Sequence, residues 1–342
     1  MANELRLECL GGMQITRNGM PLTGYVSVKV PALLCYLAVT GRPQFRLVLA
    51  GLLWSDLPEE DACANLRKAL SNLRDLTGDH LIITPHTVAF DRQSAYWLDV
   101  EAFLAAANRG VRRQARSEHV GASGPPSSPT LSSESSALPD LLAAAELYRG
   151  DFLDGFYVRH ASLFEEWVSG QREGLRRLAG RVLKQLAEHY AGSGEFDRAI
   201  ECTARLLALD PWQEEAHRQM MVLLARNGER SAALAQYETC RRLLKRELNV
   251  EPSAETTALY RRIRAIGAPR PHNLPTAVTS FVGRTAELAQ LADGLADPRR
   301  RLLSILGPAG VGKTRLALEA AAAAKERSND AFLAGIFFVP LA

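Results

Sequence analysis

Apolar and polar positions alternate in two ways along the first part of the chain, one typical of strands and one typical of helices. Residues 5–10 and 13–16 alternate at every second position, so we predict two short strands there. Longer stretches with helical spacing follow, and the predicted helices cover residues 30–39, 46–54 and 56–77. The strand-like runs on both sides of Pro85-His86 predict a hairpin over residues 81–90. Residues 96–100 are the last element of this part of the chain.

The order of these elements, strands followed by three helices and a hairpin, is that of a winged helix. The third helix is amphipathic, and its apolar stripe consists of Ala62, Leu66, Ala69, Leu70 and Leu73. Its opposite face carries Asp61, Asn65, Lys68, Ser71, Asn72 and Asp75, and its flank carries Arg67 and Arg74. Amide, hydroxyl and cationic side chains along one stripe can reach base edges and phosphates in a major groove. An ordinary solvated face is the alternative, which the two Asp residues favour because they repel phosphate.

Two breaks in composition divide the rest of the chain. Residues 117–139 are rich in Ser and Pro and cannot bury enough apolar surface to become ordered, so we predict a disordered insert. Helical spacing then continues to about residue 266, and three Pro residues within 267–275 indicate an extended linker. The domains expected from these breaks cover residues 1–100, 101–266 and 279–342, with the linker at 267–278.

The helical part contains an internal repeat. Residues 194–199 (Gly-Glu-Phe-Asp-Arg-Ala) recur as residues 228–233 (Gly-Glu-Arg-Ser-Ala-Ala), 34 positions further on. This is the period of tetratricopeptide helix pairs, in which each pair buries its apolar face on the next. Because two repeats are fewer than a free-standing array needs, flanking helices such as the one expected over 164–190 must complete the core. A simple helical bundle is the alternative.

Composition narrows the class of protein without deciding it. The apolar fraction of 47% and charged fraction of 23% are those of a soluble globular protein, and the net charge is only +3. Binding of nucleic acid would therefore depend on the local placement of cations. The five Cys residues form no CxxC pair, so we expect structural thiols and neither a zinc site nor a catalytic thiol. Without a signal peptide or a long apolar run, we expect cytoplasmic localisation and no membrane partner.

A phosphate-binding loop is the most specific chemical motif of the chain. Residues 307–314 match G-x-x-x-x-G-K-[ST], between a strand-like run at 301–306 and a helical stretch at 315–325. Backbone N–H groups of such a loop surround phosphate, Lys313 neutralises its oxygens, and the Thr314 hydroxyl binds Mg²⁺. The nucleotide-binding residues predicted on the loop are Gly307, Gly310, Val311, Gly312, Lys313 and Thr314.

The loop lies close to the end of the sequence. After Thr314 the only Asp is Asp330, in a polar segment, and residues 335–341 predict a second strand of the domain. We therefore expect an incomplete P-loop domain without a Walker-B carboxylate. Because hydrolysis needs a coordinated metal and an oriented water, we expect this chain not to be an enzyme.

Several segments resemble SARP-type transcriptional activators. These segments are Leu-Leu-Cys-Tyr-Leu-Ala at 33–38, Leu-Ala-Gly-Leu-Leu-Trp at 49–54, residues 64–74, Tyr-Arg-Gly-Asp-Phe-Leu-Asp-Gly-Phe at 148–156, the helix around Trp167, and Glu-Pro-Ser at 251–253. The resemblance implies a response-regulator-type winged helix followed by a helical bacterial transcriptional activation domain. It places the recognition helix at Asn65–Arg74 and His86 and Arg92 on or near the wing, and leaves Lys29 as the only candidate for a phosphate contact ahead of the first helix. The predicted DNA-binding residues are Asn65, Arg67, Lys68, Ser71, Asn72, Arg74, His86 and Arg92.

The segment ahead of the phosphate-binding loop is similar to the entry motif of STAND-type signalling ATPases, the NB-ARC group. It reads Phe-Val-Gly-Arg at 281–284 and is followed by Glu287-Leu288. The similarity implies that Val282, Gly283 and Arg284 lie by adenine and ribose, and that the nucleotide is ATP with Mg²⁺.

The leading hypothesis is a transcriptional activator that binds double-stranded promoter DNA as a homodimer, contacts RNA polymerase and carries a nucleotide switch. The expected fold class is a mixed multidomain chain with an α+β winged helix, an all-α tetratricopeptide-like domain and a truncated P-loop α/β domain. A STAND-type signalling ATPase with an N-terminal protein-interaction module is the alternative, and a tetratricopeptide scaffold that binds peptides is a third reading. If Lys68 and Asn72 face bases, Asn72→Ala relaxes sequence preference at one base pair.

Overall fold

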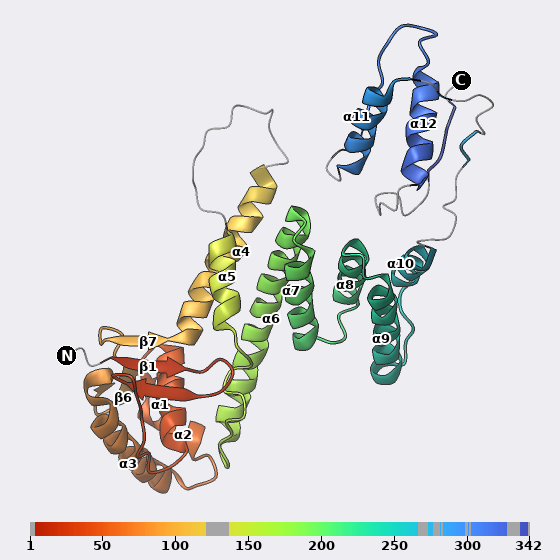
Figure 1. Cartoon of the computed structure of the whole chain (residues 1–342). Coiled ribbons are helices and arrows are strands. Elements are labelled where there is room, and N and C mark those ends of the chain that lie inside the picture. The colour runs from red at the N-terminus through yellow and green to blue at the C-terminus, as the bar shows by residue number, and fades with distance from the viewer. Residues whose placement is uncertain are drawn as a thin grey trace. The chain divides into compact units, whose positions relative to one another are not determined.

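The computed structural model divides the chain into two units, residues Met1–His189 and Tyr190–Ala342 (Figure 1). The residues that it describes are 4–120, 137–265, 273–275, 281, 283–297, 300, 302–326 and 336–340. Within these ranges the secondary structure is mostly helical, and every named strand lies between Leu5 and Leu98 in unit 1.

Unit 1 begins with a small sheet. It contains β1 (Leu5–Glu8), β2 (Gln14–Arg17), β3 (Met20–Pro21) and β7 (Tyr96–Leu98) in the order β3-β2-β1-β7. The alternation that predicted the first two strands is confirmed, because Leu5 and Leu7 are fully buried while Arg6 between them is exposed. β1 pairs with β2 antiparallel and with β7 parallel. The pairing with β7 joins distant segments without a local turn, so the sequence pattern did not reveal it.

The predicted winged helix follows and is confirmed. Its helices are α1 (Lys29–Thr40), α2 (Arg46–Leu53) and α3 (Glu59–Thr77), and its hairpin consists of β5 (Leu81–Ile83) and β6 (Thr87–Phe90). A short strand, β4 (Gln44–Phe45), pairs with β6 and gives a second sheet of order β4-β6-β5. The five residues of the predicted apolar stripe on α3 are at most 3% exposed, and α3 packs on α1 and α2. The polar face of α3 therefore points away from the core.

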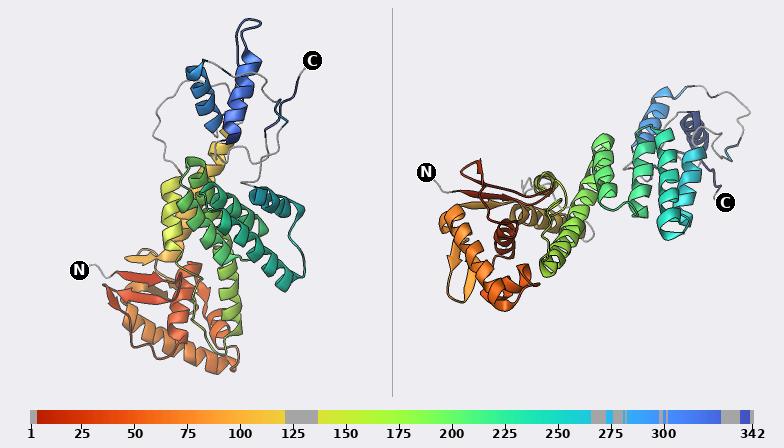
Figure 2. Two further views of the ribbon diagram at one scale, coloured as in Figure 1. Left: turned by 45° about the vertical axis from the view of Figure 1, so that its right-hand side comes forward. Right: turned by 90° about the horizontal axis from the view of Figure 1, so that it is seen from below.

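Three helices continue unit 1 beyond the winged helix. They are α4 (Asp99–Val120), α5 (Leu138–Leu147) and the long α6 (Ser162–Ser193). α4 and α5 pack along each other, as the views in Figures 1 and 2 agree. The predicted insert at 117–139 was too wide, because residues 117–120 continue α4 and residues 138–139 begin α5. Residues 121–136 lie outside the described part of the chain.

A close crossing of two segments attaches the winged helix to the start of the helical region. Leu10 forms an isolated antiparallel bridge with Phe152, and the Leu153 N–H donates to the Cys9 carbonyl over 2.8 Å. The crossing requires two glycines. Gly11 has a φ of +85°, and a Cβ on Gly150 would lie 2.9 Å from the Gly11 Cα.

A buried carboxylate fixes the same crossing. Asp99 at the start of α4 is fully buried, and its Oδ2 accepts the backbone N–H groups of Cys9 at 2.7 Å and Leu10 at 2.8 Å. Burial raises the pKa of Asp99, although these hydrogen bonds and Arg149, 3.7 Å away, oppose that shift. Asp99 thus joins the end of β1, the start of α4 and the segment that carries Arg149.

An aromatic cluster covers the crossing from the α6 side. The ring of Trp167 on α6 lies 4.8 Å from that of Tyr36 on α1 and 5.5 Å from those of Phe152 and Phe164. Tyr36, Phe152 and Phe164 are at most 9% exposed. Aromatic pairs in such edge or tilted arrangements stabilise a core beyond their buried area. The start of α6 is therefore part of the same core as the winged helix.

Unit 2 contains two helix pairs that confirm the predicted repeat. The helices are α7 (Phe196–Leu209), α8 (Glu214–Arg226), α9 (Arg230–Leu248) and α10 (Ala254–Ala265). Gly194 and Gly228 occupy equivalent turns, with φ values of +82° and +81°. After each glycine a Glu N–H donates five residues back, from Glu195 to Tyr190 and from Glu229 to Leu224. The common core of α8, α9 and α10 includes Met221, Ala233 and Ile263.

The P-loop region is described more sparsely. Its helices α11 (Thr285–Ala296) and α12 (Lys313–Glu326) pack against each other. The strand predicted at 301–306 was wrong for the described residues 302–306, where Leu302 is 83% and Leu306 90% exposed. Of the strand predicted at 335–341, residues 336–340 are described, and among these only Ile336 forms a bridge. A strand exists only where a neighbouring backbone accepts its hydrogen bonds, and no such neighbour pairs with 302–306 in the described part.

The described residues contain neither a membrane-spanning helix nor a metal-binding cluster. None of the helices there is both long and apolar enough to cross a bilayer. The same residues contain no group of His, Cys, Asp and Glu suited to hold a metal ion. All five cysteines are free thiols, and four of them are buried.

Replacing Gly150 tests the crossing. We expect Gly150→Ala to lower the free energy of unfolding by about 1–3 kcal/mol, because the new methyl group meets the Gly11 backbone. The two segments must then move apart, which strains the crossing. Gly170→Ala in α6 is the matched control, since a Cβ there meets nothing within 4 Å, and we expect it to be neutral or stabilising by up to about 1 kcal/mol. Urea denaturation measures both variants, and equal stabilities would contradict the role of the crossing.

Candidate nucleic-acid interface and nucleotide site

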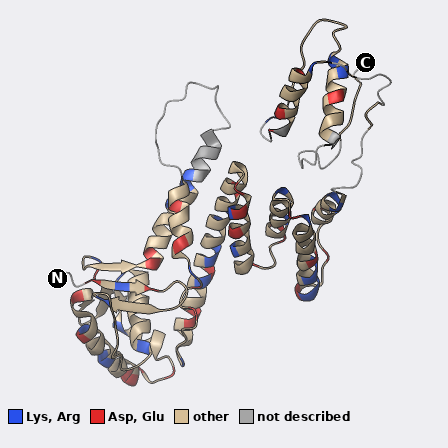
Figure 3. Ribbon diagram, in the orientation of Figure 1, with Lys and Arg blue, Asp and Glu red and all other residues tan. Residues whose placement is uncertain are grey.

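The exposed face of α3 carries cations that have no acidic partner. Arg67, Lys68, Ser71 and Arg74 are exposed, and Asn65 is half-buried among them. Arg67, Lys68 and Arg74 form no ion pair with a carboxylate in the described part of the chain. Figure 3 shows that Lys and Arg are spread over many elements without forming one continuous stripe. Any attraction of nucleic acid by this face is therefore local, as the small net charge predicts.

The side chain of Asn72 contacts the loop ahead of α1, whereas the sequence pattern predicted that it faces DNA. Its Oδ1 accepts the Val26 N–H at 3.1 Å, and its Nδ2 donates to the Gly24 carbonyl at 3.2 Å. The side-chain amide therefore holds the loop ahead of α1 against α3. We revise its expected role from base reading to positioning of this loop, because both ends of the amide are already engaged.

The hairpin forms the expected wing, with His86 exposed at its tip. The Thr84 Oγ1 accepts the N–H groups of His86 at 3.3 Å and Thr87 at 2.9 Å, which closes the turn. Arg46 at the start of α2 reaches the same tip, because its N–H donates to the His86 carbonyl at 2.9 Å and its Nη1 to the Thr84 carbonyl at 3.3 Å. Sequence reasoning missed Arg46, since only the pairing of β4 with β6 brings it to the wing.

Arg92 does not belong to the wing surface. Its Nη1 pairs with the Glu101 Oε1 at 3.0 Å, and its Nη2 lies 3.5 Å from the Ala38 carbonyl. The guanidinium occupies the space that a Cβ on Gly41 would need at the end of α1. These contacts join Arg92 to Glu101 on α4 and to the end of α1, and its part in a DNA interface stays a prediction.

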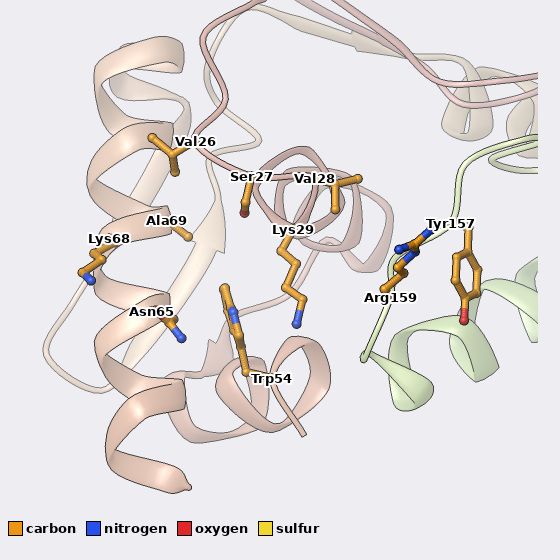
Figure 4. A pocket seen from close by; sticks show the side chains of 10 residues that line it. All are labelled: Val26, Ser27, Val28, Lys29, Trp54, Asn65, Lys68, Ala69, Tyr157 and Arg159. Atoms are coloured by element: carbon orange, nitrogen blue, oxygen red, sulfur yellow. The ribbon is translucent and has the colours of Figure 1, made fainter. Parts of the chain in front are cut away.

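A pocket of about 600 Å³ lies beside the polar face of α3 (Figure 4). It is lined by Val26, Ser27, Val28, Lys29, Trp54, Asn65, Lys68, Ala69, Tyr157 and Arg159. Lys29 lies 5.4 Å from the centre of the Trp54 ring, and its Nζ donates to the His160 carbonyl at 3.3 Å. Burial lowers the pKa of Lys29, while nearby Asp56 opposes the shift. The pocket therefore joins α3, the start of α1 and the segment ahead of α6.

The phosphate-binding loop has the geometry that its motif requires. Gly310 and Gly312 adopt φ values of +75° and +88°, which glycine tolerates best, and α12 begins at Lys313. The Lys313 Nζ donates to the carbonyls of Gly307 at 2.8 Å and Pro308 at 2.7 Å. The ammonium group thus lies over the loop, in the position from which it can meet phosphate oxygens.

The motif ahead of the loop lies next to it, and the predicted contact of this motif with adenine and ribose stays a prediction. The Arg284 Nη2 donates to the Val311 carbonyl at 2.7 Å, which joins the two motifs across 27 positions of sequence. Gly283 has a φ of +85° beside Arg284, whereas Val282 lies outside the described residues. The backbone amides of the loop and Lys313 fit the phosphates of a nucleoside triphosphate, and the Thr314 hydroxyl fits its Mg²⁺.

These features define a winged-helix protein joined to a helical-repeat domain and a P-loop region. Residues 130–264 match the bacterial transcriptional activator domain, and residues 280–340 match the AAA ATPase domain. The regulatory protein AfsR of Streptomyces griseus is 29% identical over 96% of this chain, and AfsR of Streptomyces coelicolor is 27% identical over 98%. The chain spans about a third of the length of these AfsR proteins, 33% and 34%.

Two further proteins are similar to parts of this chain, one in sequence and one in fold. The transcriptional regulatory protein MoaR1 of Mycobacterium bovis is 28% identical over 58% of this chain and 57% of its own length. The structure of Mycobacterium tuberculosis EmbR in complex with a low affinity phosphopeptide has the same fold, with a TM-score of 0.55 and 23% identity over 76% of this chain and 65% of EmbR. The chain is thus a homologue of the SARP-type regulators, with a bacterial transcriptional activator domain followed by an AAA-type ATPase region.

The revised role of Asn72 gives a direct test. We expect Asn72→Ala to destabilise the protein by about 1–3 kcal/mol, because it leaves the loop at Gly24 and Val26 without its hydrogen bonds. Any loss of DNA affinity should be the same for all sequences. Urea denaturation and binding to two unrelated duplexes check this, and a loss confined to one base pair would restore the base-reading role.

Proposed function

We propose that this chain is a transcriptional regulator that binds double-stranded promoter DNA through the exposed face of α3. The observation that carries the proposal is the set of exposed polar side chains on the third helix of a winged helix, whose cations form no ion pair within the described residues. In this fold such a helix enters the major groove. The homology to transcriptional regulators and the match to the bacterial transcriptional activator domain support it.

The polar side chains of α3 differ in their position on the helix, and we assign them different contacts. We assign base contacts to Asn65, Lys68 and Ser71 in the middle of α3, and phosphate contacts to Arg67 and Arg74 on its flank. His86 and Arg46 at the tip of the wing are assigned to the neighbouring phosphates or minor groove. The activator domain is the part proposed to contact RNA polymerase, and binding as a homodimer would give paired half-sites.

A DNA-binding assay with genomic fragments tests the proposal. We expect footprinting at moderate salt to reveal a sequence-preferring complex of the whole chain. Lys68→Ala should then relax the preference at one base pair, at a cost of about 1–3 kcal/mol, whereas Arg177→Ala on α6 should leave it unchanged. Absence of any preferred sequence would refute the proposal, and a uniform loss for Lys68→Ala would place that residue on phosphate.

We also propose that the P-loop binds ATP with Mg²⁺, and that this occupancy acts as a switch in regulation. Arg284 and the loop that it contacts form the nucleotide-binding side, Lys313 meets the β and γ phosphates, and Thr314 is assigned to the metal. The match of residues 280–340 to the AAA ATPase domain supports this assignment.

Removal of the loop lysine tests nucleotide binding. We expect Lys313→Ala to weaken binding of Mg-ATP at least tenfold in equilibrium dialysis, because the charge on the phosphates loses its neutralising partner. Arg315→Ala is the matched control, since Arg315 pairs with Glu319 at 3.8 Å on the side of α12. Equal affinities would contradict the assignment. Turnover of ATP that disappears in Lys313→Ala would favour the alternative function, a signalling ATPase, which the same AAA match leaves open.

A further inference from the structure

The pocket beside α3 is built partly by the activator domain. Tyr157 and Arg159 form one wall, and they belong to residues 130–264, the range that matches this domain. Lys29 and Trp54 of the winged helix form the floor, and Asn65 and Lys68 of α3 form the opposite wall (Figure 4). Two domains therefore share one surface next to the helix that we assign to DNA.

The lining of the pocket is cationic. Lys29, Lys68 and Arg159 all contribute to it, and none of the three forms an ion pair with a carboxylate in the described part of the chain. Among the residues described, the polar partner of Lys29 is a carbonyl oxygen, which does not neutralise it. Asp56 acts on Lys29 only through its field, and its Oδ2 lies 3.7 Å from the His160 Nδ1. The pocket thus has an excess of positive charge that favours an anion.

The backbone at Arg159 is held in place by the residues next to it in sequence. Val158 and Ala161 are at most 2% exposed, and the Val158 N–H donates to the Glu165 Oε1 at 2.8 Å. On the other side the Lys29 Nζ binds the His160 carbonyl. Arg159 itself is exposed. The backbone that carries Arg159 is therefore fixed on both sides, so that a ligand contact costs little further backbone entropy.

The anion that fits this position is the DNA backbone. Asn65 and Lys68 belong both to the pocket and to the polar face of α3, so a duplex that enters along this face also covers the pocket. Duplex DNA carries one negative charge per about 1.7 Å of its axis, and phosphates therefore follow the edge of the groove that α3 would occupy.

We propose that Arg159, from the activator domain, contacts a backbone phosphate of the DNA that α3 binds. This inference rests on the proposed DNA-binding function. It makes the activator domain a direct part of the DNA interface, so that its attachment to the winged helix contributes to affinity. Because the contact is to phosphate, it contributes to affinity on every sequence and leaves base preference unchanged.

The salt dependence of DNA binding tests the proposal with the full chain. We expect Arg159→Ala to weaken binding to the preferred duplex and to a random duplex by the same factor. The slope of log affinity against log salt should become shallower by about 0.9, the value for one phosphate contact. Between 50 and 200 mM salt the wild type would then lose about 3.5-fold more affinity than the variant.

Matched variants make the result specific. Arg159→Lys should keep the slope, and Arg112→Ala, at an exposed position on α4, should behave as the wild type. Thermal unfolding of each variant checks that the fold is unchanged.

Three outcomes would overturn the inference. The first is a slope that Arg159→Ala leaves unchanged, and the second is a loss confined to the preferred duplex. The third is saturable binding of orthophosphate to the free chain that requires Arg159 while the DNA slope stays the same. Failure of the wild type to prefer any sequence is a separate result, which would remove the proposed function and this contact together.

Discussion

The crossing of the segment after β1 with residues 149–153 is the contact on which unit 1 depends. Two chain segments approach there so closely that Gly11 and Gly150 must both lack a side chain. Asp99 satisfies the backbone N–H groups that the crossing would otherwise leave buried without a partner. A buried carboxylate is costly to desolvate, and it is tolerated here because three backbone donors and Arg149 surround it. The winged helix therefore packs together with the segment that leads into α6.

This attachment gives the activator domain its influence on the candidate interface. Trp167 on α6 packs on Tyr36 of α1, and the turn just before α6 brings Arg159 beside Lys29. The charge that faces the proposed DNA site thus comes from both domains, which a net charge of +3 for the whole chain does not reveal. In unit 2 the repeated helix pairs share a core of their own, and the phosphate-binding loop and Arg284 meet through one hydrogen bond.

Local patterns predicted most of the elements and the position of the phosphate-loop motif between them. The apolar spacing of α3, the glycine turns of the repeat and the motif at 307–314 each depend on residues close together in sequence, and the structure has them in the expected places. The patterns failed where an element needs a distant partner. Residues 302–306 read as a strand, yet among the described residues no strand pairs with them.

The sequence by itself determined the class of domains, their order and the polar face of α3, because amphipathic spacing and a phosphate-loop motif are local properties. Tertiary structure alone decided which polar side chains are left free of contacts within the described part of the protein and so available to a ligand. Asn72 is engaged by the loop at Gly24, and Arg92 pairs with Glu101. Arg46 reaches the tip of the hairpin and Arg159 the pocket beside α3, both from outside α3. The physical reason is that a side chain's partners are set by the folding of remote segments onto it, and periodicity along one helix contains no information on those segments.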